Sequence, residues 1–181
     1  MLGARRLVFF GFLACIGACY WAIQAFYLSS FISSIGSSPL HWLYVSENSL
    51  LNGTDWPTGT RNLDKSLPIH AYWLLDEYFS IDADITIYFY SLFEILCTLF
   101  ACAFFFRSLS QSDDKYLITI FAVVSALSSL PAMNLANFGY PHHYGLYYSL
   151  AGALRLVAIA CMLTNRPWLA SLSITLSIMT H

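Results

Sequence analysis

"TIYFYSLFEILCTLFACAFFF", residues 86–106, decides the class of fold to which this sequence belongs. A helix needs about 20 mainly apolar residues to cross the hydrocarbon core of a bilayer, and this stretch supplies them around one charged side chain, Glu94. Residues 7–32, 116–136 and 144–163 have a similar length and composition. In the whole chain of 181 residues, 58% are hydrophobic and only 10% are charged. The sequence therefore predicts an all-α polytopic membrane protein.

A fifth apolar run, residues 168–181, follows the turn signal "TNRPW" at residues 164–168. We expect this run to begin a fifth span, with residues 1–181 forming a single transmembrane domain in the N-terminal part of a longer chain. The alternative is a short re-entrant or interfacial helix, because apolar runs of about 10–14 residues often form such segments. The sequence thus predicts four to five transmembrane helices.

Composition and residue spacing argue against several other classes of protein. The net charge is −2 and the basic residues are scattered, so we expect no nucleic-acid partner. All the cysteines fall in apolar runs, and no Cys-x-x-Cys or His-x-x-x-His spacing gives support to a structural zinc site. The apolar run behind Arg5 and Arg6 is too long for a cleaved signal core and indicates an uncleaved anchor.

The basic residues of the short connections predict the orientation of the chain in the membrane. Arg5 and Arg6 precede the first span, Arg107 and Lys115 flank the second connection, and Arg166 lies in the fourth. Lysine and arginine are enriched in short cytoplasmic loops, so these ends and the N-terminus should face the cytoplasm. The loop of residues 33–85 and the connection of residues 133–143 should then be extracytoplasmic.

The long outer loop, residues 33–85, is unusually acidic for so apolar a chain. It holds seven of the ten carboxylates: Glu47, Asp55, Asp64, Asp76, Glu77, Asp82 and Asp84. From Ser66 onward, Pro68 and apolar residues at helical spacing predict a short amphipathic helix on the outer membrane surface. Such a helix would hold its carboxylates just above the bilayer, where the polar head of a lipid-linked substrate lies.

A carboxylate in that position can act as a general base toward an incoming hydroxyl, especially where partial desolvation raises its pKa. The alternative is that the acids only keep the loop hydrated. The loop also carries Trp56, Tyr72, Trp73 and Tyr78, residue types suited to stacking on sugars or to lying at the membrane interface.

Two charged residues fall inside the predicted spans. Counted from the outer ends of their spans, Glu94 and Arg155 lie at depths of roughly 12 and 16 Å at helical rise. The similar depths predict an intramembrane ion pair between them. Such residues usually pair or line a water-filled cavity, so a functional site and a pair that only fixes helix packing both remain open.

The second outer connection is rich in aromatic and polar residues, including the adjacent His142 and His143. Together with loop carboxylates these histidines could hold a phosphate or a divalent metal ion, although two histidines make only half of a metal site. The alternative is an aromatic belt at the membrane interface.

This arrangement resembles the opening of the polytopic GT-C superfamily of glycosyltransferases: a cytoplasmic N-terminus, one span, a large acidic outer loop with a juxtamembrane helix, and then short-looped spans. The segment "GLYYSLAGALRLVAIACMLTNRPWLASLSITLSIMTH", residues 145–181, is similar to a pattern that ends in Thr/Ile-His in many bacterial members. The resemblance is one of topology and residue pattern, without a fixed signature motif.

The resemblance implies an inverting transfer of a sugar from a lipid-phosphate-linked donor at the extracytoplasmic face of a bacterial plasma membrane. It places the catalytic acid in the first outer loop, where the candidates are Glu47, Asp55, Asp76 and Glu77. The groups that would steady the departing lipid phosphate are Arg61, Lys65, His142 and His143. Membrane lipid and a polyprenyl-phosphate sugar donor are the expected partners, and the need for a divalent metal ion stays open.

Two other functions fit the same sequence. A transporter or channel fragment would use Glu94 and Arg155 to line a path, with the outer loop as its vestibule. A non-enzymatic membrane subunit would use the outer loop to bind a partner protein.

Overall fold

The computed structural model describes residues 2–35, 78–81, 83–111, 114–138 and 148–180, together with Ala71 and Leu74. The predicted all-α class is confirmed for this part of the chain, which contains five helices and no strand. The helices are α1 (Leu2–Ile35), α4 (Ala83–Ser110), α5 (Lys115–Phe138), α6 (Tyr148–Leu163) and α7 (Pro167–Thr180).

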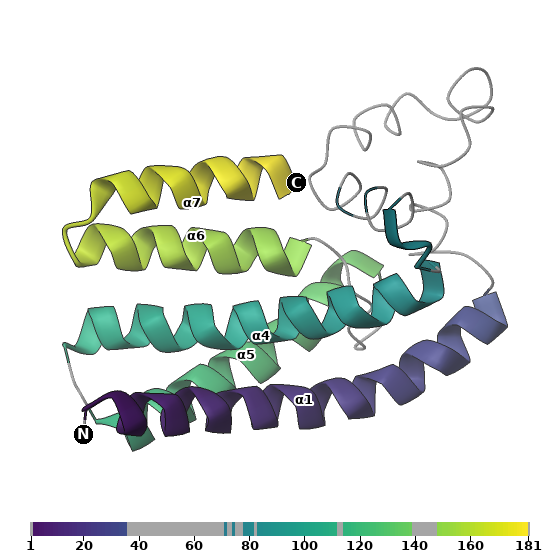
Figure 1. Cartoon of the computed structure of the whole chain (residues 1–181), viewed down its shortest axis with the longest axis horizontal. Coiled ribbons are helices and arrows are strands. Elements are labelled where there is room, and N and C mark those ends of the chain that lie inside the picture. Colours follow the sequence, from purple (N-terminus) through teal and green to yellow (C-terminus); the bar gives the residue numbers. More distant parts are fainter. Residues whose placement is uncertain are drawn as a thin grey trace.

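Consecutive helices run in opposite directions, so each end of the bundle gathers a distinct set of helix termini (Figure 1). One end holds the N-terminus, the α4 to α5 connection and the α6 to α7 connection; we call it the basic end, because Arg5, Arg6, Arg107, Lys115 and Arg166 belong to these segments. The other, which we call the loop end, holds the last turns of α1 and α5 and the first turns of α4 and α6.

Among the described residues, two helices are long and apolar enough to cross a membrane, at Leu7–Phe26 in α1 and Tyr88–Ser110 in α4. Helix α1 has 34 residues and therefore a length of about 51 Å, which exceeds the ~30 Å hydrocarbon core. The apolar parts of the other helices are shorter: Lys115–Leu130, Ser149–Leu163 and Pro167–Thr180. The number of spans, predicted as four to five, stays a prediction.

The connection between α4 and α5 is short because the sequence caps both helices. Gln111 has a φ of 52°, in the left-handed region, and its N–H donates to the carbonyl of Arg107, which ends α4. The Oδ1 atom of Asp114 accepts hydrogen bonds from the N–H groups of Tyr116 at 3.0 Å and Leu117 at 3.3 Å. Asp114 is thus an N-cap that satisfies two of the free donors in the first turn of α5.

The turn expected at "TNRPW" joins α6 and α7 as a tight helical hairpin. Asn165 has a φ of 57°, its N–H donates to Met162 O, and the N–H of Arg166 donates to Cys161 O at 2.7 Å. These bonds form a Schellman motif, with asparagine in the left-handed position that ends a helix. Pro167 then begins α7 at the position where the missing N–H of proline costs nothing.

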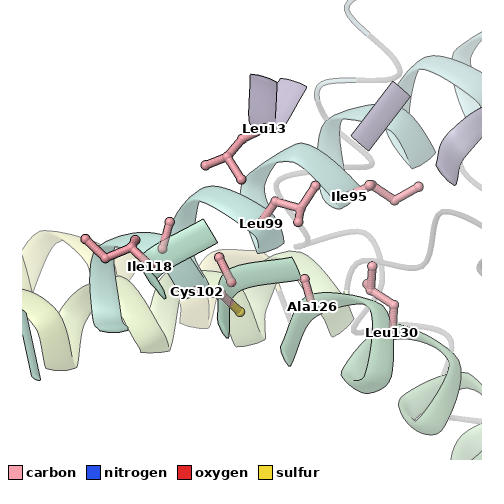
Figure 2. Packing of buried hydrophobic residues seen from close by; sticks show 9 residues of the cluster. Leu13, Ile95, Leu99, Cys102, Ile118, Ala126 and Leu130 are labelled. Atoms are coloured by element: carbon pink, nitrogen blue, oxygen red, sulfur yellow. The ribbon is translucent and has the colours of Figure 1, made fainter. Parts of the chain in front are cut away.

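Helix α4 lies at the centre, packed against α1, α5 and α6, and α7 packs against α6. The main cluster of buried side chains joins α1, α4 and α5, where Ile118, Ala122, Ala126 and Leu130 of α5 recur at every fourth position (Figure 2). Leu13 of α1 belongs to the same cluster. A stripe of period four is the pattern of a helix that packs along one face.

Residues inside the bundle are smaller and more polar than those outside it. Many buried positions are alanine, serine or threonine, among them Ser91, Thr98, Ala153 and Ser173. Large apolar side chains face outward on all five helices: Phe26 of α1 is 71% exposed, Tyr116 of α5 85% and Ile178 of α7 70%. Small residues at helix interfaces with large apolar residues around them are typical of helices packed in lipid.

Candidate functional site

In the described part of the chain, Glu94 of α4 is a charged residue type that is completely buried, with 0% of its surface exposed. Its Oε1 atom accepts a hydrogen bond of 3.3 Å from the backbone N–H of Leu150, in the first turn of α6. The N–H groups of a first helical turn have no acceptor within their own helix. Glu94 therefore caps α6 from a neighbouring helix and ties α4 to α6 near the loop end.

The free N–H groups in the first turn of α6 give this end of the helix a partial positive charge, which suits an oxygen acceptor such as Glu94 Oε1. Thr98, one turn further along α4, donates its hydroxyl to the Glu94 carbonyl at 2.8 Å and so satisfies its own polar group locally. The buried Glu94 thus has a structural role, which is to join α4 to the first turn of α6.

Arg155, at the middle of α6, belongs to a second polar network between α6 and α7. Its Nε donates to the hydroxyl oxygen of Ser177 at 3.2 Å, and the Ser177 hydroxyl donates to the carbonyl of Ala151 at 3.0 Å. Ser177 is 1% exposed, whereas the arginine side chain is exposed on the surface of the bundle. The network fixes the register of α6 against α7.

The sequence predicts an ion pair between Glu94 and Arg155. In the structure, Glu94 accepts a hydrogen bond from the Leu150 N–H, and Arg155 donates one to the Ser177 hydroxyl. Both residues belong to the α4, α6 and α7 part of the bundle, since Glu94 bonds to the first turn of α6 and Arg155 to α7. The ion pair stays a prediction.

Sequence reasoning missed Ser177 as the partner of Arg155. A signal was present in the spacing of the small residues of α7, because Ala170, Ser173, Ser177 and Thr180 recur at intervals of three and four and are all buried. Such a stripe predicts close contact with another helix. It does not predict which residue of that helix the hydroxyl meets.

The helix α1 joins the bundle through a close approach that the sequence reading also missed. A Cβ atom at Gly17 would lie 2.7 Å from Leu96 Cδ2 and 3.0 Å from Leu99 Cδ1 of α4. One turn further, the indole N–H of Trp21 donates to the carbonyl of Tyr88 at 2.9 Å. These contacts hold α1 beside the half of α4 that carries Glu94.

The other candidate site residues lie outside the described part of the chain. They are the four candidate bases Glu47, Asp55, Asp76 and Glu77 and the four candidate phosphate-binding residues Arg61, Lys65, His142 and His143. Of the amphipathic helix expected from Ser66, the structure describes Ala71, Leu74, Tyr78 and Phe79 as helical and exposed, and the rest also lies outside.

Two connecting segments carry the predicted site residues. The acidic segment, residues 36–82, connects the end of α1 to the start of α4, and the histidine segment, residues 139–147, connects the end of α5 to the start of α6. All four of these helix termini lie at the loop end (Figure 1). Within the described residues, no three histidine, cysteine or acidic side chains come together as a metal site would require.

In comparisons with known proteins, no family model matches the chain, and neither the curated proteins nor the solved structures give a significant match.

Proposed function

We propose that this chain is a multi-pass integral membrane protein that transfers a sugar from a lipid-phosphate-linked donor at its loop end. The membrane part of the proposal is supported by the surface of the bundle. Only 17% of the most apolar stretch of α1, within Leu7–Phe26, is buried, whereas the core helix of a water-soluble protein would be mostly buried. Outward apolar side chains on the other four helices extend the same argument around the bundle.

The observation that carries the catalytic part is the meeting of four helix termini at the loop end. The acidic segment and the histidine segment both start and finish there, while the arginines and lysine of the short connections belong to the opposite end. A base and a phosphate-binding group must lie on the same side of a membrane to act on one substrate. The topology supports this requirement, and the resemblance to the GT-C superfamily supplies the reaction.

In the proposed reaction, a carboxylate of the acidic segment removes the proton from an acceptor hydroxyl. The hydroxyl oxygen attacks the anomeric carbon of the donor sugar, the bond from that carbon to the phosphate oxygen breaks, and polyprenyl phosphate leaves with the electron pair. Attack from the face opposite to the leaving group inverts the anomeric configuration. Arg61, Lys65, His142 or His143 would stabilise the phosphate as its charge increases.

The test is a transfer assay in proteoliposomes with radiolabelled hexoses and pentoses carried on undecaprenyl phosphate. Glu47→Gln, Asp55→Asn, Asp76→Asn and Glu77→Gln are compared one at a time with Asp64→Asn as a matched control from the same segment. We expect one of the four to lower kcat at least a hundredfold, since a general base contributes roughly 10²–10⁴ in rate. Asp64→Asn should leave the rate within about twofold.

Uniformly small effects in all four variants would contradict a catalytic base and indicate that the acids hydrate the loop. An absence of transfer with every donor, in protein that remains folded by circular dichroism, would contradict the transferase proposal as a whole. The retained binding of a partner protein through residues 36–82 would then favour the non-enzymatic subunit.

A further inference from the structure

A large apolar groove opens on the surface between α1 and α5. Its volume is about 810 Å³, and its walls come from Val8, Phe9, Phe12 and Ile16 of α1 and from the stretch of α5 between Lys115 and Val124. Both helices pack on α4 but contact each other little, which leaves the space between them open. No candidate residue of the proposed transferase site lines this groove.

The groove has a charged end and an apolar length. Lys115 is the one charged residue among those that the structure gives as its lining, and it lies at the first position of α5, at the basic end. The nearby Asp114 carboxylate is held by the N–H groups of Tyr116 and Leu117 at the start of the helix.

The length of the groove matches half of a bilayer. From Lys115 to Val124 the α5 axis rises by roughly 13 Å, close to one leaflet of a hydrocarbon core of about 30 Å. A lysine at the membrane boundary extends its ammonium group toward the headgroup layer. An acyl chain in the groove would therefore bring its headgroup phosphate to the ammonium group of Lys115.

We infer that the α1 and α5 groove binds one anionic phospholipid of the leaflet at the basic end, with an acyl chain between Phe12 and Ile120 and the headgroup at Lys115. The inference rests on the membrane placement proposed above and not on sugar transfer. An anionic lipid is favoured over a neutral one because one basic residue near the membrane surface raises the affinity for anionic lipid by about fivefold.

The experiment measures lipid retention by native mass spectrometry on the whole chain, purified in mild detergent with equal amounts of dioleoyl phosphatidylglycerol and dioleoyl phosphatidylcholine. Lys115→Gln removes the charge of the groove, and Arg166→Gln removes a charge at the same end but outside the groove. Ile120→Trp fills the groove from a side chain that is 60% exposed, and Ile174→Trp places the same bulk on α7, where the isoleucine is 49% exposed.

We expect the unmodified protein to retain phosphatidylglycerol about fivefold more than phosphatidylcholine. Lys115→Gln should bring this ratio close to one and Ile120→Trp should remove the bound lipid, whereas Arg166→Gln and Ile174→Trp should match the unmodified protein. Circular dichroism on each variant confirms that the helices are intact.

Equal retention of the two lipids by the unmodified protein would overturn the inference while leaving the membrane proposal standing. An equal loss of preference in Arg166→Gln would also overturn it, because the selectivity would then come from the whole basic end. A dimer that Ile120→Trp abolishes and Ile174→Trp preserves would assign the groove to a second copy of the chain. A chain that stays in solution without detergent and carries no phospholipid would refute the membrane placement itself.

Discussion

The close approach of α1 to α4 at Gly17 gives a prediction whose size follows from the structure. A Cβ at this position would lie 2.7 Å from Leu96 Cδ2 and 3.0 Å from Leu99 Cδ1, whereas carbon atoms in favourable contact are about 3.5–4.0 Å apart. Leu96 is half-buried, whereas Leu99 is 0% exposed and is packed in the main buried cluster. Added bulk at residue 17 must therefore push α1 away from α4.

Gly11 supplies a control in the same helix, because a Cβ there would meet no atom within 4 Å. Replacing a glycine inside a helix improves helix propensity by about 0.8–1.0 kcal/mol at either position, so this gain cancels in the comparison. Overpacking a well-packed contact costs about 1–3 kcal/mol. We expect Gly17→Leu to be about 2 kcal/mol less stable than Gly11→Leu, with Gly17→Ala between them.

The assay is unfolding in mixed micelles, with sodium dodecyl sulfate titrated into dodecyl maltoside and helix content followed by circular dichroism. Displacing α1 should also weaken the hydrogen bond from the Trp21 indole to the Tyr88 carbonyl, which adds a change in tryptophan emission. Equal unfolding midpoints for Gly17→Leu and Gly11→Leu would refute the packing of α1 on α4 at this point.

The remaining predictions concern the polar contacts and the helix ends. Glu94→Leu should cost about 1–3 kcal/mol by leaving the Leu150 N–H without its acceptor, and Glu94→Gln less, both measured by the same unfolding titration. If Glu94 and Arg155 form an ion pair, a double-mutant cycle of Glu94→Gln and Arg155→Gln should give a coupling free energy of unfolding of about 0.5 kcal/mol or more. Additive effects would contradict the ion pair. Ser177→Ala should cost about 1–2 kcal/mol through its bonds to Arg155 and Ala151, and an unchanged midpoint would contradict the α6 to α7 network. Asn165→Gly should stabilise the hairpin slightly and Asn165→Val should destabilise it by about 1–2 kcal/mol, since a φ of 57° suits glycine and strains a branched side chain; the reverse order would exclude the left-handed turn.

The helices could be read from the sequence because their signals are local. Apolar length marked α1, α4 and α5, and "TNRPW" marked the hairpin in which Asn165 and Pro167 have their usual roles. The expected boundary of the fourth span, Tyr144–Leu163, agrees with α6 at its C-terminal end, where Leu163 is the last residue.

The polar contacts could not be predicted because they depend on which helices become neighbours. The acceptor role of Glu94 is directed at a backbone N–H, which every residue type except proline carries, so no sequence pattern points to Leu150. Ser177 lies 22 residues from Arg155, and only the hairpin brings them together. Gly17 fits the space beside Leu96 because of the crossing of α1 and α4, which hydrophobicity alone does not determine.

The most direct test of the central claim, a membrane bundle whose loop end and basic end face opposite sides, is labelling by a membrane-impermeant maleimide in intact cells. One cysteine is added at a time. Ser49→Cys lies in the segment that connects α1 to α4, Asn137→Cys in the last turn of α5, and Ser110→Cys and Asn165→Cys at the basic end. The five native cysteines, all in apolar helices, give the background. We expect the first two to react in intact cells and the last two to react only after the membrane is permeabilised. Reaction of all four in intact cells, or of one position from each end, would contradict it.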